Sequence, residues 1–381
     1  MSDLSFYVHI PYCVKRCGYC DFNTYTPSEL REGGTLETVS GDYIDAVLEE
    51  IRIAREQVSA VGVSTIFFGG GTPSLLPPRD LGRVISAIKE KWDLAPDAEI
   101  TLEANPDSVD ADKLVELRAA GFNRISFGMQ SAVPHVLQVL DRTHKPENIA
   151  KVVSAAREAG FESISLDLIY GTPGETLEDF RTSVTTALGL GVDHLSAYAL
   201  IVESGTKLAA QIKRGELSMP NDDLMADMYL LVDQLCEETG LSWYELSNWS
   251  KPNHESRHNG AYWRNANWWG LGPGAHSHLD GVRWWNVKHP TAYKKALFEG
   301  QSSIQDREEL TSQQKSDESI MLSIRMRDGI SLSDLSQAQR EKVAPYRQSG
   351  HLDSTRWEEG SLQLTPNGRL IADRIVRELV V

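Results

Sequence analysis

Three cysteines follow the first apolar run of the chain, in the stretch Tyr7-Val8-His9-Ile10-Pro11-Tyr12-Cys13-Val14-Lys15-Arg16-Cys17-Gly18-Tyr19-Cys20. Their spacing would also suit one face of a helix, but Pro11, Gly18 and the charged pair Lys15-Arg16 speak against a buried helix. A zinc site is a second alternative, and a neighbour such as His9 would have to supply its fourth ligand. We expect a loop in which Cys13, Cys17 and Cys20 hold three irons of a [4Fe-4S] cluster and leave the fourth iron without a protein ligand.

Short apolar and β-branched runs alternate with amphipathic helical stretches from this point to residue 200, which is typical of an α/β fold with parallel strands. Most runs are largely apolar, as expected for strands covered on both faces. The expected strands are residues 6–10, 65–68, 99–103, 124–128, 163–170 and 194–200. The expected helices between and after them are residues 43–58, 80–92, 112–120, 148–159, 177–188 and 221–238. The sequence therefore predicts an α/β fold built on a partial (β/α)6 barrel.

The alternation stops after residue 200, and seven of the nine tryptophans lie between residues 243 and 285. We expect a core over residues 1–240, a Trp-rich α+β extension over 241–305 and a C-terminal module over 306–381. The module's expected elements, in an order that resembles a winged helix, are helices at 313–325, 332–335 and 337–349, strands near Trp357 and Leu362, and a closing helix from Pro366.

The composition is that of an ordinary globular protein, with 381 residues, 41% hydrophobic, 24% charged and a net charge of −16. This charge argues against nucleic acid as a partner, and the balanced charges of residues 311–381 agree. Four cysteines in a chain of this length are not a disulfide framework and indicate a reducing compartment. The N-terminus lacks the basic and apolar regions of a targeting signal, and no run of about 18 apolar residues occurs, so we expect a cytoplasmic protein.

The cysteine spacing, directly after a predicted first strand, resembles that of the radical S-adenosylmethionine (SAM) superfamily. The resemblance implies that the amino and carboxylate groups of SAM chelate the open iron. It also implies that an electron from the reduced cluster can cleave the sulfonium to a 5′-deoxyadenosyl radical, so an electron donor would be a partner.

A glycine turn and several polar residues lie at or near the expected strand ends, where β/α barrels assemble their chemistry. Gly69-Gly70-Gly71-Thr72-Pro73 lacks the lysine of a nucleotide-binding loop, and either permits a tight turn or lets a ligand's amino group approach the backbone. Glu103 can accept from an ammonium group, and Arg142 has the planar fork that suits a carboxylate. Asp167 suits ribose hydroxyls.

Five stretches resemble the oxygen-independent coproporphyrinogen-III oxidase family of radical SAM proteins. They are residues 7–13, the glycine turn, Phe127-Gly128-Met129-Gln130-Ser131, Asp141-Arg142-Thr143-His144 and residues 167–174. Carried over position by position, the family's SAM contacts fall on Tyr7, Tyr19, Gly70, Gly71, Thr72, Glu103, Gln130, Arg142 and Asp167.

Two departures separate the chain from the oxidase itself. Phe22 stands where the oxidase pattern has a further cysteine, and only twelve residues precede Cys13, whereas the oxidase has a longer N-terminal extension. In addition, the stretch from His258 to Trp263 resembles the His-Asn-x-x-Tyr-Trp signature of the related heme chaperones (HemW-type proteins). The resemblance implies heme binding and transfer to acceptor proteins, among them respiratory cytochromes at the membrane. Oxidative decarboxylation of coproporphyrinogen is the alternative, a nucleic-acid-linked regulator is a weaker third option, and homodimer formation is left open.

The expected heme residues are His258, Asn259, Tyr262 and Trp263, with His276 and His278 in reserve. An imidazole is a natural axial ligand of heme iron, and aromatic rings offer faces to a porphyrin. The alternative for His258 is a hydrogen-bonded residue in an aromatic core. Residues 270–275 match a dinucleotide-binding fingerprint, which we reject because no clear strand precedes them and Pro273 suits the required helix badly. Cys236 is expected to be a packed helix residue.

Overall fold

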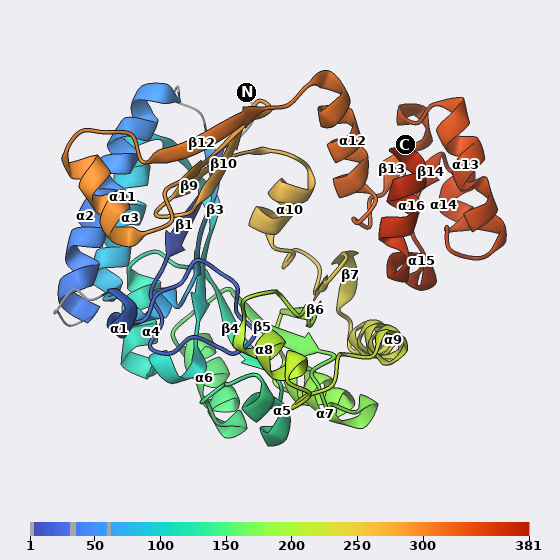
Figure 1. Ribbon diagram of the computed structural model, residues 1–381, viewed down its shortest axis with the longest axis horizontal. Helices are drawn as coiled ribbons and strands as arrows, with labels where there is room; N and C mark the ends of the chain where they lie inside the picture. Colours follow the sequence, from blue (N-terminus) through green and yellow to red (C-terminus); the bar gives the residue numbers. More distant parts are fainter. Residues whose placement is uncertain (1–3, 31–35, 59–61, 381) are drawn as a thin grey trace.

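One twelve-stranded sheet runs through the molecule, and the six strands expected from the sequence form its middle (Figure 1). The computed structural model describes residues 4–30, 36–58 and 62–380. Strands β1 to β6 lie in chain order and are parallel, which confirms the α/β class. They are β1 (Leu4–Ile10), β2 (Gly62–Gly70), β3 (Asp93–Ala104), β4 (Arg124–Gln130), β5 (Ser163–Tyr170) and β6 (His194–Ala199). The sheet is open, with β12 and β7 as its edges.

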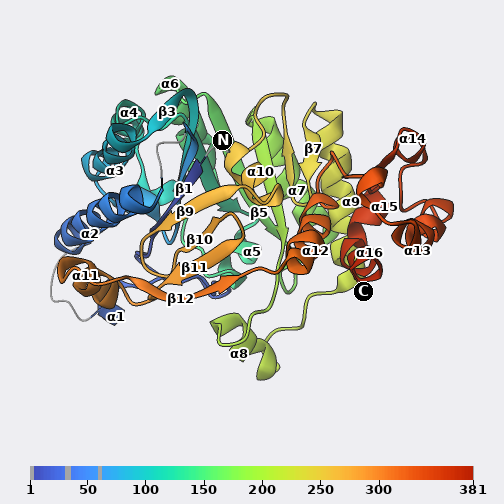
Figure 2. The ribbon, with the colours of Figure 1, turned by 90° about the horizontal axis from the view of Figure 1, so that it is seen from above.

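Helices connect these strands and cover the outer face of the sheet (Figures 1 and 2). Their ends follow local signals: Asp110 accepts from the Lys113 amide at the start of α4, and Thr176 forms a capping box with Asp179 at the start of α7. The helices are α2 (Leu36–Gln57), α3 (Pro78–Lys91), α4 (Ala111–Ala119), α6 (Pro146–Glu158), α7 (Leu177–Gly189) and α9 (Asp222–Glu238). The expected helices are therefore confirmed, although the first begins earlier than residue 43. The short helices α1 (Pro27–Leu30) and α5 (Pro134–Val139) were not expected.

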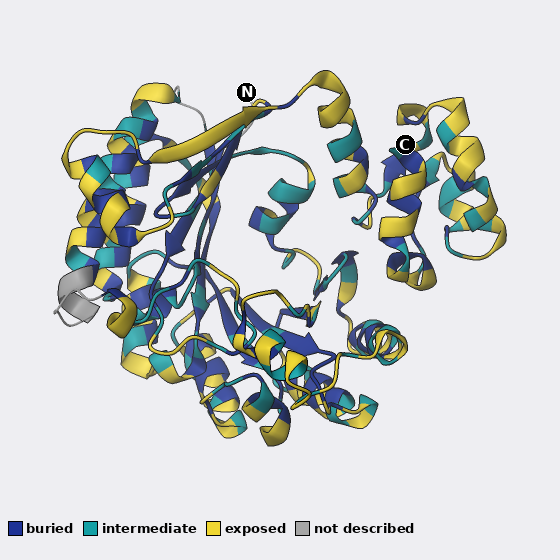
Figure 3. Ribbon diagram, in the orientation of Figure 1, coloured by how far each residue is buried: buried dark blue, intermediate teal, exposed yellow. Residues whose placement is uncertain are grey.

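The central strands alternate between apolar and polar residues, so the expectation of largely apolar strands is wrong, whereas the burial of successive residues confirms that both faces are covered. In β4, for example, Ile125, Phe127 and Met129 belong to the main core, whereas Arg124 and Ser126 alternate with them. Because successive side chains point to opposite faces of a strand, the polar set faces away from the outer helices. Figure 3 shows these strands as a largely buried part of the chain. The inner face of the barrel is therefore both buried and polar.

The Trp-rich segment adds strands to both edges of the same sheet. Strand β9 pairs in parallel with β1, and β10, β11 and β12 follow in antiparallel order, while β8 and β7 extend the sheet beyond β6. These elements are β7 (Ser242–Glu245), β8 (Asn248–Ser250), α10 (Arg257–Trp263), β9 (Asn267–Leu271), β10 (His276–Leu279), β11 (Val282–Asn286), α11 (Pro290–Phe298) and β12 (Ile304–Glu309). The limits at residues 240 and 305 stay a prediction.

The expectation that no strand accompanies the fingerprint at residues 270–275 is wrong, because β9 includes Gly270 and Leu271. The pairing of this five-residue strand with β1 is set by the fold and has no local signal. The next element is β10 rather than a helix, which agrees with the rejection of a dinucleotide site.

The C-terminal module has an apolar core of its own, formed by residues such as Ile324, Val343, Leu362 and Ile375. The expected strand at Trp357 is wrong: Asp353 caps the short helix α14 there, and the partner of β14 is β13, earlier in the chain. The closing helix is interrupted at Ile371. The elements are α12 (Ser312–Ser323), β13 (Ile330–Ser331), η3 (Leu332–Asp334), α13 (Gln337–Gln348), α14 (Ser354–Glu358), β14 (Ser361–Leu362), α15 (Pro366–Leu370) and α16 (Ala372–Leu379). The winged-helix likeness stays a prediction.

A buried ion pair joins this module to the core. Arg369 of α15 donates to both carboxylate oxygens of Asp233 on α9, at 2.8 and 2.6 Å, and its guanidinium lies 4.3 Å from the ring centroid of Trp243. Asp233 also accepts from the indole N–H of Trp249. The module is thus attached to α9 through a charge that is shielded from water.

Within the described ranges, none of the helices is both long and apolar enough to span a membrane.

The Arg369 contact predicts a local stability effect. Replacing Arg369 by Met leaves the buried Asp233 carboxylate without its cation, and such a loss costs about 3 to 5 kcal/mol. We expect amide hydrogen exchange in α15 and α16 to become more than about 100-fold faster. The matched control is Arg356→Met, which removes an exposed ion pair with Glu359 and should change exchange by less than about five-fold. Equal effects of the two substitutions would contradict the role of the buried pair.

Candidate functional site

The three cysteines lie on a loop that follows β1 at the carboxyl edge of the sheet. The loop returns to its own start, because the Tyr25 amide donates to the Pro11 carbonyl at 2.7 Å and the Cys13 amide to the Tyr25 carbonyl at 3.1 Å. None of the three cysteines lies in a helix, and all are free thiols of intermediate burial. The alternative of three cysteines on a buried helix face is therefore wrong.

The environment of the thiols suits a metal cluster. Burial, with a smaller contribution from the charges of Cys20 and Cys17, raises the pKa of Cys13 to about 11, against the hydrogen bond from Thr72. Two donors nevertheless point at the sulfurs: the Thr72 hydroxyl lies 3.8 Å from Cys13 Sγ, and Arg142 Nη1 lies 3.5 Å from Cys17 Sγ. Soft thiolates together with donors that favour negative sulfur are the chemistry that an iron–sulfur cluster requires.

The zinc alternative lacks its fourth ligand. His9 Nε2 lies 2.9 Å from the Asn23 carbonyl and Nδ1 lies 3.0 Å from the Tyr7 hydroxyl, so both ring nitrogens are engaged. Across the described ranges, no three His, Cys, Asp or Glu side chains gather around a point that a single metal ion would occupy. Cysteines that bind separate irons of one cluster do not need to meet at one point.

The glycine turn at the end of β2 holds the start of the cysteine loop. The Gly71 amide donates to the Ile10 carbonyl at 2.7 Å, and the Thr72 amide to the Tyr12 carbonyl at 2.8 Å. A Cβ on Gly71 would lie 2.5 Å from the Tyr12 carbonyl oxygen, and Gly70 has a φ of +108°. Glycine is thus required both by the close approach of the loop and by the backbone conformation.

The half-buried carboxylates of Glu103 and Asp167 lie beside this turn, and among the described residues no cation forms an ion pair with either of them. Burial and, to a lesser extent, the charge of Asp167 raise the pKa of Glu103 to about 8, against the hydrogen bond from the Gly70 amide, which lies 3.2 Å from Glu103 Oε2. Burial also raises the pKa of Asp167, against hydrogen bonds from Ser126 and Ser196. A ligand with an ammonium and a sulfonium group, such as SAM, would supply the positive charge that this pair lacks.

Arg142 and Gln130 meet above Gly128, close to Cys17. Arg142 Nη2 donates to the Gly128 carbonyl at 2.9 Å, and its buried Nε has no partner among the described residues. Gln130 has a φ of +62°, and its amide nitrogen would lie 2.8 Å from a Cβ on Gly128. The free guanidinium donor suits the carboxylate of an amino-acid ligand.

The structure brings the sequence-predicted SAM residues to one rim of the barrel. Tyr7 and Glu103 both lie against Gly69 of the glycine turn. A Cβ atom added to Gly69 would be 3.2 Å from the Tyr7 ring and 3.0 Å from the Glu103 carboxylate. Tyr19 lies near Cys17 and Arg142, and burial raises its pKa. The donor set thus fits both a cluster and SAM.

His258 lies in α10, inside the barrel, and both of its ring nitrogens are engaged. Nδ1 lies 2.7 Å from the Thr65 hydroxyl and Nε2 lies 2.8 Å from the Tyr262 hydroxyl, while the ring stacks on Phe67 at 5.0 Å. Burial lowers the pKa of His258 to about 3, so the imidazole is neutral. In this arrangement neither nitrogen is open to heme iron, and His258 has the hydrogen-bonded role that was its alternative.

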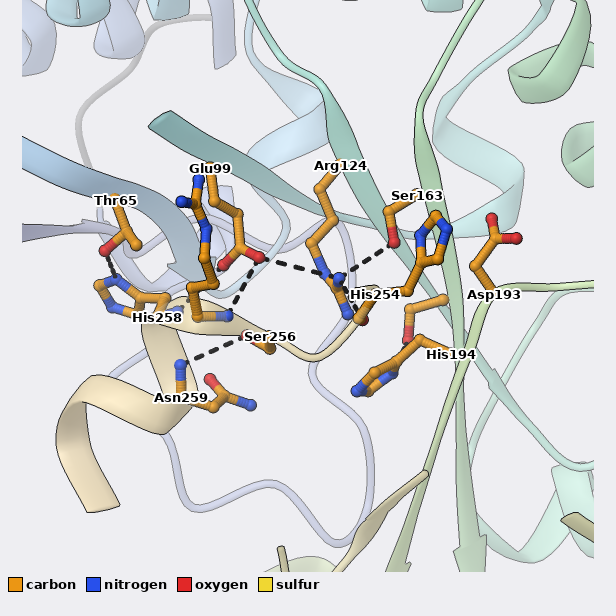
Figure 4. Close-up of polar contacts among 12 residues, drawn as sticks. Thr65, Glu99, Arg124, Ser163, Asp193, His194, His254, Ser256, His258 and Asn259 are labelled. Atoms are coloured by element: carbon orange, nitrogen blue, oxygen red, sulfur yellow. Dashed lines mark hydrogen bonds and ion pairs between the residues drawn. The ribbon is translucent and has the colours of Figure 1, made fainter. Parts of the chain in front are cut away.

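Charged residues of the inner sheet face fix α10 in place (Figure 4). The two carboxylate oxygens of Glu99 accept from the amides of Arg257 and His258, at 3.1 and 3.0 Å. Arg124 lies 3.8 Å from Glu99 and donates to the His254 carbonyl. Sequence reasoning missed Glu99 and Arg124 as functional residues, although charged residues within central strands are a signal that could have found them.

Of the remaining candidate residues, Asn259, Tyr262 and Trp263 lie in α10, whereas His276 and His278 lie in β10 and Cys236 in α9. Tyr262 packs edge-on against Trp268 at 4.8 Å, and both are half-buried. His278 is buried, with Nδ1 near the Ala266 carbonyl and Nε2 accepting from the Gly281 amide. His276 is exposed beside Trp285. Cys236 is buried in α9, as expected.

Comparisons with known proteins agree with this site. The Radical SAM superfamily model matches residues 7–187. A protein called heme chaperone HemW from Mycobacterium tuberculosis (strain H37Rv) is 45% identical over 375 residues, which cover 98% of this chain and 94% of the relative. Heme chaperone HemW from Escherichia coli (strain K12) is 35% identical over 303 residues, which cover 78% and 77%.

A solved structure has the same fold over nearly the whole chain. Coproporphyrinogen III oxidase (HemN) from Escherichia coli, described as a radical SAM enzyme, superposes with a TM-score of 0.83 at 26% identity, over 99% of this chain and 90% of that one. Because the chain is 45% identical to a heme chaperone HemW over nearly its full length, and because its cysteine loop and carboxylate pair fit a cluster and SAM, it belongs to the HemW family of heme chaperones, within the radical SAM superfamily.

Proposed function

We propose that this protein is a heme chaperone that carries a [4Fe-4S] cluster and SAM, binds heme and passes it to acceptor proteins. The observation that carries the proposal is the position of α10. Its His-Asn-x-x-Tyr-Trp stretch lies in the same barrel as the SAM residues, with the rings of His258 and Tyr7 6.5 Å apart. A heme site at α10 would thus neighbour the cluster and SAM.

Cys13, Cys17 and Cys20 would hold the cluster, whose chemistry is the transfer of an electron to the sulfonium of SAM. Glu103, which accepts from the Gly70 amide, would also accept from the ammonium group of SAM, and Arg142 would bind the carboxylate of SAM. The other SAM residues that we propose are Tyr7, Tyr19, Gly71, Thr72, Gln130 and Asp167.

The heme site that we propose is formed by His258, Asn259, Tyr262 and Trp263. Tyr262 and Trp263 are half-buried and can offer ring faces to a porphyrin. For His258 to become an axial ligand, it must give up its hydrogen bond to Thr65 or to Tyr262. Heme binding is therefore coupled to a rearrangement of the α10 contacts.

We further propose acceptor proteins such as respiratory cytochromes at the membrane, an electron donor for the cluster, and a homodimer. The compartment that we propose is the cytoplasm, which the four free thiols support.

Coproporphyrinogen-III oxidation is a second candidate, favoured by the fold shared with the oxidase over nearly the whole chain. Phe22, where the oxidase pattern has a cysteine, opposes it. Anaerobic incubation with coproporphyrinogen III, SAM and a reductant separates the two: a vinyl-bearing product would establish the oxidase, and its absence together with heme transfer would establish the chaperone.

Heme titration tests the proposed site. The wild type should show a shifted Soret band, and His258→Ala should lose it. Thr65→Val removes a hydrogen bond of about 1 kcal/mol from His258 Nδ1 and should tighten heme binding by up to about five-fold. The matched control is His135→Ala, which removes an exposed histidine beside Asp179 and should leave the titration unchanged. A Soret shift that His258→Ala retains in full would exclude His258 as the ligand.

We expect Glu103→Gln to weaken SAM binding and to increase the stability of the ligand-free protein. The folded-state pKa of Glu103, about 8, lies above its ordinary value of 4.5. The folded ligand-free protein therefore binds more protons than the unfolded chain, and the residue becomes more destabilising as pH rises from about 4.5 to 8. Glu103→Gln should therefore be more stable than the wild type at pH 8, by on the order of 3 kcal/mol, and this gap should shrink towards pH 5.

Urea unfolding at the two pH values measures this gap, and calorimetric titration with SAM should show weaker binding by Glu103→Gln. Glu162→Gln, at an exposed pair with Arg118, serves as the control. A gap that does not change with pH would contradict the raised pKa of Glu103.

A further inference from the structure

A second segment of the chain lies across the cysteine loop. It includes α8 (Lys207–Lys213), which projects from the body of the molecule in Figure 2. The amide of Leu208 donates to the carbonyl of Gly18, between Cys17 and Cys20, at 2.9 Å. The Leu208 side chain is buried in a small apolar cluster, apart from the main core, that also contains Leu140 and has Tyr19 packed against it. The segment therefore contacts the loop through both backbone and side chain.

The carboxylate of Asp141 joins the same two segments. It lies 2.7 Å from Lys207 Nζ of α8 and 3.5 Å from Lys15 Nζ of the cysteine loop. A Cβ on Gly18 would lie 2.6 Å from Asp141 Oδ2, so the carboxylate rests directly on the loop backbone. Its side chain is 16% exposed, whereas both lysines are more than half exposed. One half-buried anion thus has two cations from different parts of the chain.

The backbone at Asp141 is adapted to this position. Its φ is +56°, a conformation that Asp and Asn adopt more readily than most other residues. The next residue, Arg142, donates to Cys17 Sγ. The backbone conformation at Asp141 therefore directs its own carboxylate towards Gly18 of the loop and the guanidinium of Arg142 towards Cys17 Sγ.

The two sides of the loop are held differently. Its start is fixed to β2 by the amides of Gly71 and Thr72. Farther out, Arg16 bonds to Thr24 and Glu29, which belong to the loop's own return and to α1. The return of the loop is held by Asn23, which donates to the carbonyls of Pro273 and Lys288, and the part around Cys17 and Gly18 is contacted by α8, Asp141 and Arg142. Loss of the latter contacts would leave Cys17 and Cys20 on a segment that is anchored only at its ends.

We propose that Asp141 is a positioning residue for the cluster: through Lys15 and Lys207 it clamps the cysteine loop beneath α8 and thereby governs how firmly the cluster is retained and how far oxidants reach it. The inference rests on cluster binding by Cys13, Cys17 and Cys20. It adds to that site a residue that is not among those we assign to the cluster or to SAM.

The test compares Asp141→Asn with the wild type in the full-length chain. Asparagine keeps the shape of the residue and its tolerance for positive φ but removes the charge. In the metal-free protein we expect amide exchange over residues 14–20 and 205–213 to become about five-fold faster, with no change in the rest of the sheet. In the reconstituted protein, bleaching of the cluster in air should be about five-fold faster. Both effects should diminish in 1 M salt, which screens the ion pairs of the wild type.

Two further proteins serve as controls. Asp45→Asn removes an exposed pair with Arg83 on the outer helices and should match the wild type in every measurement. Cys17→Ser should lower the amount of bound iron whether or not the ion pairs of Asp141 with Lys15 and Lys207 are intact. If the wild type takes up no iron and sulfide, the proposed cluster binding is contradicted. Amide hydrogen exchange in the metal-free protein still decides whether Asp141 holds the loop to α8.

A variant that keeps Asp141 covers the case in which Asp141→Asn does not fold. The double variant Lys15→Met, Lys207→Met should reproduce the faster exchange and the faster bleaching, and adding Asp141→Asn to it should cause no further change, because the three charges act as one unit. Exchange and bleaching rates of Asp141→Asn or of the double variant that equal those of Asp45→Asn would overturn the proposal.

Discussion

The structure depends on the alternation of side chains along six parallel strands. Apolar residues face the outer helices, so every second residue faces the interior of the barrel, where burial makes an unpaired polar group costly. Away from the carboxyl ends of the strands, Thr65, Glu99 and Arg124 form hydrogen bonds with the segment around α10. At the carboxyl ends, Glu103 and Arg142 retain unmet charge or donors. Polar groups in the first region are satisfied by the protein itself, whereas those at the carboxyl ends would be satisfied by a ligand.

This division gives α10 two roles. As a structural element it closes one half of the barrel, with its first turn fixed to Glu99 and its imidazole between Thr65 and Tyr262. As the carrier of the heme chaperone signature, it would have to release one of these contacts to bind iron. A buried, fully hydrogen-bonded histidine in a chaperone is reasonable if heme is to be held reversibly, because the protein contacts that heme displaces lower its net affinity.

The cysteine loop is also held by two different kinds of contact. Its inner side is fixed by backbone hydrogen bonds that require glycine at position 71, and its outer side is fixed by side chains and by α8. The backbone hydrogen bonds are insensitive to salt, whereas the exposed ion pairs are weakened by it. The fold shared with coproporphyrinogen III oxidase over nearly the whole chain shows that this scaffold also occurs in a second radical SAM protein.

Local patterns in the sequence determined the cysteine loop, the order of strands and helices and the rim residues, since thiol spacing, apolar period and glycine content are read over a few neighbouring residues. The bounds of β5 were predicted to the residue. The tertiary structure alone decided that β9 pairs with β1, that Glu99 and Arg124 hold α10, that His258 has no open nitrogen and that Asp141 meets Lys15 and Lys207. Each of these joins residues that are far apart in the chain, and their pairing depends on the twist and register of the whole sheet, which no local pattern encodes.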